Sequence, residues 1–378
     1  MTELLTHFRA RKDDMLDLLG ELVRRESFTA DKARVDQLAD YLEGLLGHFG
    51  AKSLQRLPQP EVGDFLLAAW NPTAPGKPVL VLCHIDTVHP LGTLVESPIR
   101  HDGDRWYGPG ALDMKAGAVI VLTALQSLHN QKRLARPVKL LMTTDEEIGS
   151  PQSRAVIEAE AADAELVLVL EPATPEGAIK TARKGGAKYT LTIEGRPAHA
   201  GIAPQLGINA IIEFAQQALE INGLNDLKYG TSVSVTRVTG GSAGNVIPAH
   251  VEAHIDTRAI TSAEMQRVEQ ALASLYPKMP GAIVRCQRQG FRPPMERQAG
   301  IFERAAEIAA RQGITLEEGA SGGGSDGNFT AAMGIPTLDG LGAHGDGAHT
   351  LHEHIITDSL PRQAAVIAAL LLEWNAGG

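Results

Sequence analysis

Histidine and carboxylate side chains stand in this sequence at the ends of segments that have the pattern of core strands. Residues 79–86 form an almost unbroken apolar run that ends in His84 and Asp86. Such a run is typical of a strand buried on both faces, and residues two apart on a strand project to the same face. The pair is predicted to be either a metal-binding histidine with a supporting carboxylate or a strand-end histidine in an ordinary hydrogen bond.

Further carboxylates follow the same pattern. Asp113 stands just before a predicted helix, where an aspartate is also a common N-cap. Glu146 and Glu147 come directly after an apolar run, and Glu171 ends another. A solvated turn would explain one acidic cluster, but adjacent acids at the end of a core strand repel one another without a counter-ion. Their recurrence at successive predicted core elements favours one shared site.

These residue types predict a centre with two divalent metal ions. Two ions about 3.5–4 Å apart can activate a water and polarise a carbonyl, which is a common way to hydrolyse an amide. Zinc binds histidine and carboxylate and leaves a coordination position open. We assign His84 and Glu171 to one ion, Glu147 and His349 to the other, and Asp113 to both as the bridge.

Two carboxylates remain for supporting roles. Asp86 is predicted to orient His84 from outside the ligand set. Glu146 is predicted to take the proton of the attacking water and pass it to the leaving amine. His352 lies close to His349 in the same histidine-rich loop and is a rival metal ligand.

The pattern of the chain predicts an α/β protein that positions these residues. Beyond residue 180 the order becomes strand, helix, strand, strand, helix, strand, which is that of a ferredoxin-like domain. We predict a catalytic domain formed by residues 1–179 and 293–378, with a central mixed sheet flanked by helices, and an inserted ferredoxin-like α+β domain at 180–292. In the catalytic domain, helices are predicted at 2–24, 31–48, 116–128 and 300–311 and from about 357, and strands at 65–70, 79–85, 138–143, 166–170 and 335–338.

Composition narrows the classes of partner. The 378 residues carry a formal net charge of −10, so nucleic acid and anionic membrane are not expected partners. Neither an uninterrupted apolar N-terminal core nor a run of 18 apolar residues is present, which predicts a cytoplasmic protein without a membrane span. Cys83 and Cys286 stand in predicted strands, and we expect them to be packing residues.

The ordered motifs resemble those of the dinuclear zinc amidohydrolases, a family that includes glutamate carboxypeptidase, acetylornithine deacetylase, succinyl-diaminopimelate desuccinylase and the aminoacylases. The resemblance is strongest to the bacterial glutamate carboxypeptidase branch, and it runs through the inserted domain. The motifs that carry it are 84–88, 108–110 with 113–115, 145–150, 171–172, 183–186, 198–201, 204–209, 244–248, 256–258 and 347–349.

The resemblance implies further roles. The inserted domain would be a lid and dimerisation module, and the protein a homodimer with two zinc ions per subunit, or cobalt or manganese in their place. His199 would stabilise the oxyanion, supplied across the dimer, and Asn245 would help to bind substrate. Arg292 would grip a substrate carboxylate, for which a planar guanidinium is well suited. Without the resemblance, His199 is equally a turn residue and Arg292 a solvated linker arginine.

The glycine-rich loop at 321–327 suggests a different class of enzyme. Its Gly323-Gly324-Ser325-Asp326-Gly327 fits the nucleophile elbow of serine hydrolases, but that reading leaves the other carboxylates unexplained. We expect Gly323 instead to let the backbone lie close to substrate. A non-catalytic protein of the same fold would be expected to have lost a ligand or the base, and here all are present.

The sequence thus predicts an amide hydrolase that acts on a small peptide or N-acyl amino acid and releases an amino acid. Glu171, at a position where the resemblance separates carboxypeptidase and deacylase members from aminopeptidase-like ones, favours an amine half with a free α-carboxylate. A deacylase similar to acetylornithine deacetylase is the alternative, and a serine hydrolase that uses Ser325 is a remote one.

Overall fold

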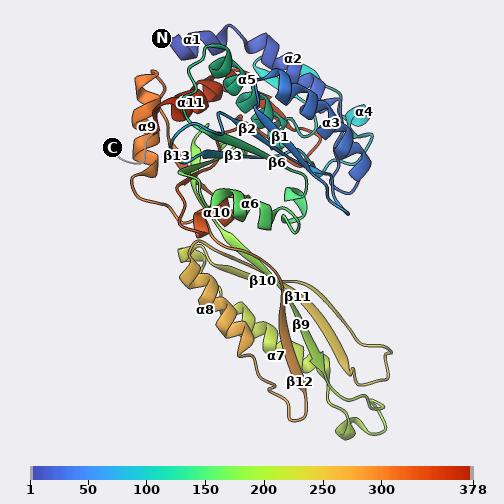
Figure 1. Cartoon of the computed structure of the whole chain (residues 1–378). Coiled ribbons are helices and arrows are strands. Elements are labelled where there is room, and N and C mark those ends of the chain that lie inside the picture. The colour runs from blue at the N-terminus through green and yellow to red at the C-terminus, as the bar shows by residue number, and fades with distance from the viewer. Residues whose placement is uncertain (1–2, 375–378) are drawn as a thin grey trace. The chain divides into compact units, whose positions relative to one another are not determined.

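Two compact units make up the protein in the computed structural model, which describes residues 3–374. The larger unit holds the residues up to Thr181, Arg297–Ser321 and the residues from Ser325 onward, and the smaller unit holds Ala182–Glu296 with Gly322–Gly324. Figure 1 shows both units. The lid and dimerisation roles expected of residues 180–292 stay predictions.

A six-stranded mixed sheet forms the centre of the larger unit, which confirms the predicted α/β fold. The first three strands in the sheet order pair antiparallel, and the last four pair parallel. The order is β1 (Ser53–Leu57), β2 (Phe65–Trp70), β6 (Val138–Thr143), β3 (Val79–His84), β7 (Leu166–Val169) and β14 (Thr337–Leu338). Because β6, β3 and β7 are parallel neighbours, their carboxyl ends meet at one edge of the sheet.

Strand β3 is buried on both faces, as its apolar run predicts. Val79, Val81 and Cys83 belong to the core beneath one helical layer, whereas Leu80 and Leu82 belong to the core on the other face. Figure 1 shows α5 and α11 on one side of this sheet and α6 on the other. The helices of this unit are α3 (Lys32–His48), α4 (Thr93–Glu96), α5 (Ala116–Asn130), α6 (Arg154–Ala161), α9 (Ile301–Arg311), α10 (Gly327–Ala332) and α11 (Ser359–Glu373), besides α1 and α2.

The single helix predicted over residues 2–24 was wrong. Residue 2 lies outside the described residues, and the remainder forms α1 (Glu3–Arg9) and α2 (Lys12–Val23) with a break at Arg11. The apolar stripe is interrupted there, and the guanidinium of Arg11 instead donates to Gln126 Oε1 and Ser127 Oγ of α5. The contacts of Arg11 with α5 therefore outweigh the local preference of the chain for one continuous helix.

The smaller unit has the predicted ferredoxin-like order. Its four strands form one antiparallel sheet in the order β10-β11-β9-β12. Apolar residues of the strands and of both helices form its separate core. The elements along the chain are β9 (Gly185–Glu194), α7 (Ala210–Asn222), β10 (Ser232–Gly240), β11 (His250–Ala259), α8 (Ser262–Ala273) and β12 (Ile283–Arg292).

Several short strands were not predicted, because they are too brief or too polar to show a period. A four-stranded sheet in the larger unit joins two distant parts of the chain, and it bears on the site below. Its strands are β15 (Gly345–Asp346), β16 (His354–Ile356), β5 (Arg105–Tyr107) and β4 (Arg100–Asp102); β8 (Ile179–Arg183) and β13 (Glu318–Ser321) form a further pair.

One helical stretch among the described residues, Ala111–Asn130, is long and apolar enough to cross a membrane. However, 89% of its most apolar window is buried inside the protein, as in the central helix of a folded core. Both cysteines are free, and Cys83 is buried in β3.

Candidate metal centre

The parallel strands deliver the predicted ligands to one edge of the sheet. His84 is the last residue of β3, and Glu147 lies in a 3₁₀ turn, Glu146–Ile148, that follows β6. Glu171 follows β7. Asp113 lies in the segment Ala111–Lys115 that precedes α5, where its own backbone angles are not helical, and His349 comes from the loop between β15 and β16. Five residues from separate parts of the chain thus reach one place.

The carboxylate of Asp113 stands between two histidines. Its Oδ1 lies 3.1 Å from His84 Nε2, and its Oδ2 lies 3.2 Å from His349 Nε2. His84 Nε2 is also 3.6 Å from Glu171 Oε1, and His349 Nε2 is 3.3 Å from Glu147 Oε2. The five side chains therefore form two groups that share Asp113, each with one histidine and one glutamate.

This donor set fits divalent metal ions. Ligand atoms of His84, Asp113 and Glu147 lie within 4.8 Å of one another, and so do those of His84, Glu146 and Glu171. Among the described residues, Oε1 of Glu147 is buried without a hydrogen-bond partner. A buried carboxylate oxygen is costly unless it is paired, and a cation would pair it. Nitrogen and oxygen donors of this kind are those that zinc binds in hydrolases.

The pKa values of these groups show how strongly they interact. Burial lowers the pKa of His84, but hydrogen bonds to Asp113 and Asp86 outweigh it and raise that pKa well above its usual value. Hydrogen bonds to Asp113 and Glu147 raise the pKa of His349 to about 10. Burial raises the pKa of Asp113, yet the two histidines reverse this and hold it low. Burial is the main cause of the raised pKa of Glu147. Protons on the histidines thus hold the carboxylates together in the metal-free protein.

Asp86 lies where it can orient His84. Its side chain is fully buried, with Oδ1 3.3 Å from His84 Nδ1, and its backbone carbonyl lies 3.1 Å from the same nitrogen and accepts its hydrogen bond. Its Oδ2 accepts hydrogen bonds from Thr29 Oγ1 at 2.8 Å and from the backbone N–H of Glu147 at 3.4 Å. Because Nδ1 faces this carboxylate, Nε2 is the nitrogen that faces Asp113 and Glu171. Sequence reasoning missed Thr29, since nothing in its local sequence links it to a residue 57 positions away.

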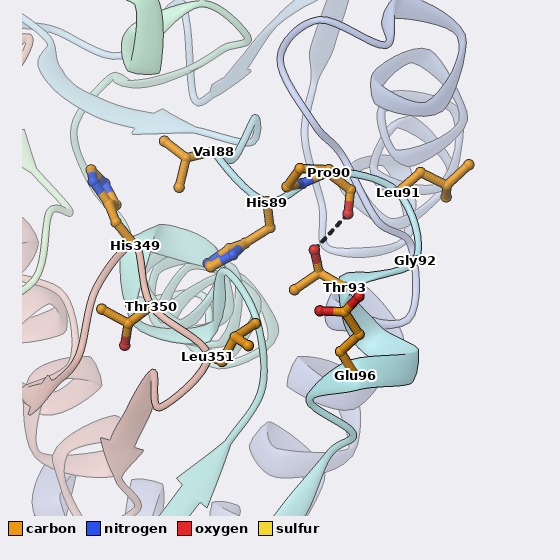
Figure 2. A pocket seen from close by; sticks show the side chains of 10 residues that line it. All are labelled: Val88, His89, Pro90, Leu91, Gly92, Thr93, Glu96, His349, Thr350 and Leu351. Carbon is orange, nitrogen blue, oxygen red and sulfur yellow. Dashed lines mark hydrogen bonds between the residues drawn. The ribbon is translucent and has the colours of Figure 1, made fainter.

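His349 sits in a strained loop beside a hollow in the surface. Its φ of 65° is unusual for a residue with a Cβ, and strained backbone of this kind is common at functional sites. A hollow of about 430 Å³ adjoins it, lined by 88–93, Glu96 and 349–351. Figure 2 shows His349 and His89 on its wall. His349 and the rival ligand His352 are both exposed, and the histidine that lies against Asp113 and Glu147 is His349.

The predicted substrate-binding residues belong to the smaller unit. His199 and Asn245 lie together, since the backbone N–H of Ala200 donates to the carbonyl of Asn245. The Nδ1 of His199 accepts from the backbone N–H groups of Gly201 and Ile202, at 3.2 and 3.1 Å. That arrangement places the ring proton on Nε2, as a donor needs. Arg292 ends β12, and Gly323 offers its carbonyl to Arg183 at 3.2 Å.

Ser325 has no geometry for nucleophilic attack. Its side chain is fully buried, and its hydroxyl donates to Asp339. A nucleophilic serine needs a hydroxyl that substrate can reach and a base, usually a histidine, that takes its proton. The hydroxyl of Ser325 is buried, and its partner is a carboxylate. The glycine-rich loop therefore has no support as a nucleophile elbow.

Comparisons with known proteins find relatives along most of the chain. The model of Peptidase family M20/M25/M40 matches residues 80–373. Carboxypeptidase G2 of Pseudomonas sp. (strain RS-16) is 30% identical over 98% of this chain and 92% of its own length. Succinyl-diaminopimelate desuccinylase of Rhodospirillum centenum is 29% identical over 96% of this chain and 98% of its own.

Solved structures show the same fold. Aminopeptidase PepT from Bacillus cereus has a TM-score of 0.78 at 23% identity, with 96% of this chain and 98% of that chain covered. The metallo-carboxypeptidase Sso-CP2 from Sulfolobus solfataricus has a TM-score of 0.73 at 20% identity, with 95% and 98% covered. The family match, the relatives and the cluster of metal-ligand side chains agree, and the chain belongs to Peptidase family M20/M25/M40 as a metal-dependent hydrolase.

Proposed function

We propose that this protein is a di-zinc amide hydrolase that releases an amino acid from a peptide or N-acyl amide, in the manner of a glutamate carboxypeptidase. The observation that carries the proposal is the Asp113 carboxylate, which has one oxygen against each of two histidines. Similarity to carboxypeptidase G2 supports the carboxypeptidase branch. A deacylase is the alternative, and the desuccinylase relatives support it.

In this proposal His84 and Glu171 hold one ion, Glu147 and His349 hold the other, and Asp113 holds both. When bound, the two ions would supply Lewis-acid activation of the water and of the scissile carbonyl. Zinc is the proposed metal, with cobalt or manganese as substitutes that bind the same donors.

The protein's own groups move the proton. Glu146 lies beside the ligand Glu147, and its carboxylate is within 4.8 Å of ligand atoms of His84 and Glu171. We assign it as the base that takes a proton from the attacking water and returns it to the nitrogen of the leaving amine. Asp86 keeps the His84 ring in place and takes no proton.

The smaller unit is proposed to supply the substrate contacts. The Nε2–H of His199 would donate to the oxyanion that forms at the carbonyl, and Asn245 would assist binding. Arg292 would pair with the α-carboxylate of the released amino acid, and Gly323 would offer backbone to the substrate. We further propose a homodimer in which His199 serves the partner's site.

The hollow beside His349 bears on the acyl half of the substrate. Its lining combines apolar side chains, among them Leu91 and Leu351, with Glu96, and none of its lining residues is lysine or arginine. A carboxylate placed there would meet the like charge of Glu96 and no lysine or arginine, and His349 is already paired with Asp113 and Glu147. We therefore propose that the hollow takes an uncharged acyl group, which favours carboxypeptidase-like substrates over succinyl ones.

The test combines metal analysis with a substrate panel. About two zinc ions per chain, and hydrolysis of N-benzoyl-glutamate that a chelator abolishes and zinc restores, would support the proposal. N-succinyl and N-acetyl amino acids in the same panel distinguish the deacylase. Metal-free protein with full activity that a serine-directed reagent abolishes would overturn the proposal.

A matched variant tests the base. Glu146→Gln keeps the size of the side chain but cannot accept the water's proton, so turnover should fall by a factor of about 10² or more while metal content stays near that of the unchanged protein. Loss of a metal ion from this variant instead would show that Glu146 is a ligand.

A further inference from the structure

The carboxylate of Glu353 is buried and accepts four hydrogen bonds from two other parts of the chain. Its side chain is 1% exposed. Oε1 accepts from the backbone N–H groups of Leu112 and Asp113, at 2.7 and 3.0 Å. Oε2 accepts from the backbone N–H of Gly110 at 2.9 Å and from His89 Nε2 at 2.7 Å. Three of these four donors are backbone groups of the turn that carries Asp113.

The position of Glu353 in the chain links this turn to His349. Glu353 closes the loop that carries His349 and directly precedes β16, whose His354 pairs with Tyr107 of β5. The backbone N–H of Gly108 also donates to the carbonyl of Glu353, at 3.2 Å. His89, which lies on the wall of the hollow beside His349 in Figure 2, donates to the same carboxylate. One side chain thus ties together the loops that follow β3 and β5 and the loop that precedes β16.

We propose that Glu353 is a positioning residue that sets the place of the Asp113 carboxylate, and through it the affinity of both metal ions together. The inference rests on the proposed di-zinc function. Asp113 can serve two ions only if its two oxygens face His84 and His349 at once. The backbone N–H of Asp113 itself is bound to Glu353, so a shift of that turn moves the shared ligand. Both sites should then weaken, whereas loss of an unshared ligand contact would weaken one.

A carboxylate is required at this position because every partner is a donor. A glutamate accepts with both oxygens. A glutamine has one oxygen, and its NH₂ group would meet either the N–H groups of Leu112 and Asp113 or the N–H of Gly110. Glu353→Gln therefore keeps the size of the side chain and breaks part of the network. Changes to groups that hold metal ligands in place typically lower metal affinity 10- to 100-fold.

The experiment measures metal binding on the full chain, freed of metal with a chelator. Zinc affinities of the two sites are measured by competition with a chelating indicator, and cobalt is added to record the visible spectrum, which reports ligand geometry. Glu353→Gln is expected to raise both zinc dissociation constants at least about tenfold and to change the cobalt spectrum.

Two variants at His89 keep the test informative if Glu353→Gln folds poorly. His89→Leu removes one donor and should weaken both sites in the same direction but less. His89→Gln offers an amide N–H in place of the ring N–H and should restore affinity toward that of the unchanged protein. Asp64→Asn is the matched control, because it removes a paired carboxylate far from these loops in the sequence and should lower thermal stability without changing zinc affinity.

Three results would contradict the role proposed for Glu353. Unchanged zinc affinities and cobalt spectrum in Glu353→Gln and His89→Leu, with only a lower melting temperature as in Asp64→Asn, would show a purely structural role and overturn the inference alone. Weakening of one site only would overturn the shared action through Asp113. A parent protein that binds no zinc would overturn the proposed function, and this inference with it.

Discussion

Replacing Asp86 by asparagine tests whether His84 is held for metal binding. The side chain is fully buried, and its two oxygens meet His84 Nδ1, Thr29 Oγ1 and the backbone N–H of Glu147. An asparagine has one oxygen for these partners. His84 Nδ1 keeps its hydrogen bond to the backbone carbonyl of residue 86. Whichever way the amide is turned, however, its NH₂ group faces either the ring of His84 or the N–H of Glu147, and the negative charge that balances His84 is lost.

The size of the effect follows from these contacts. A hydrogen bond to a charged group contributes about 1.5–3 kcal/mol, and loss of a partner that orients a ligand lowers metal affinity about 10- to 100-fold. At about 1.4 kcal/mol per factor of ten, that range is about 1.4–2.8 kcal/mol. We expect the loss of zinc-binding free energy in Asp86→Asn to lie within this range.

The assay is competition titration of zinc into chelator-stripped protein at constant pH, with turnover measured at saturating zinc. Asp64→Asn again serves as the control, since Asp64 bonds to Lys32 and Arg56 and to no metal ligand. Zinc affinity and turnover that match the parent in Asp86→Asn would refute the argument that this carboxylate holds His84 in place.

Three further predictions follow from the same contacts. Zinc affinity should rise as the pH is raised toward about 10. The pKa values of His84 and His349 are raised, so both histidines carry protons that zinc must displace on binding. Zinc titrations at several pH values measure this dependence. Burial raises the pKa of Asp64, but hydrogen bonds from Lys32, Gln59 and Arg56 outweigh it and lower that pKa from 3.8 to about 2. The ionised carboxylate therefore stabilises the folded protein above pH 3.8, and this stabilisation is lost as the pH falls toward 2. Asp64→Asn should therefore cost about 1–2 kcal/mol in urea unfolding at neutral pH and little near pH 2. His199→Ala should lower kcat about 10²- to 10³-fold without changing the oligomeric state in sedimentation, and an unaltered kcat would contradict its role as oxyanion donor.

Much of the centre could be predicted because its residues are attached to elements with strong local signals. The apolar run of β3 predicts a strand buried on both faces that ends at His84, and Asp86 follows two residues later, with its carboxylate against the His84 ring. Apolar runs before Glu147 and Glu171 predict β6 and β7, and a parallel arrangement brings their carboxyl ends together. For these residues a local pattern and one rule of sheet geometry suffice.

Other parts of the site could not be predicted from a local sequence pattern. Thr29 and Glu353 act through bonds to residues 57 and 240 positions away, and neither belongs to a periodic segment. The break between α1 and α2 and the small sheet with β5 and β16 were missed for the same reason. Short polar segments have little preference of their own, so their conformation is set by partners elsewhere in the chain.

The sequence by itself determined which side chains could hold metal and which strands carry most of them, because residue chemistry and strand periodicity are local properties. Only the tertiary structure decided that one Asp113 oxygen faces each histidine, that His349 rather than His352 lies against Asp113, and that Ser325 is buried against Asp339. These outcomes depend on how loops distant in the chain pack against one another. Such packing is a property of the whole folded unit, and no single stretch of residues encodes it.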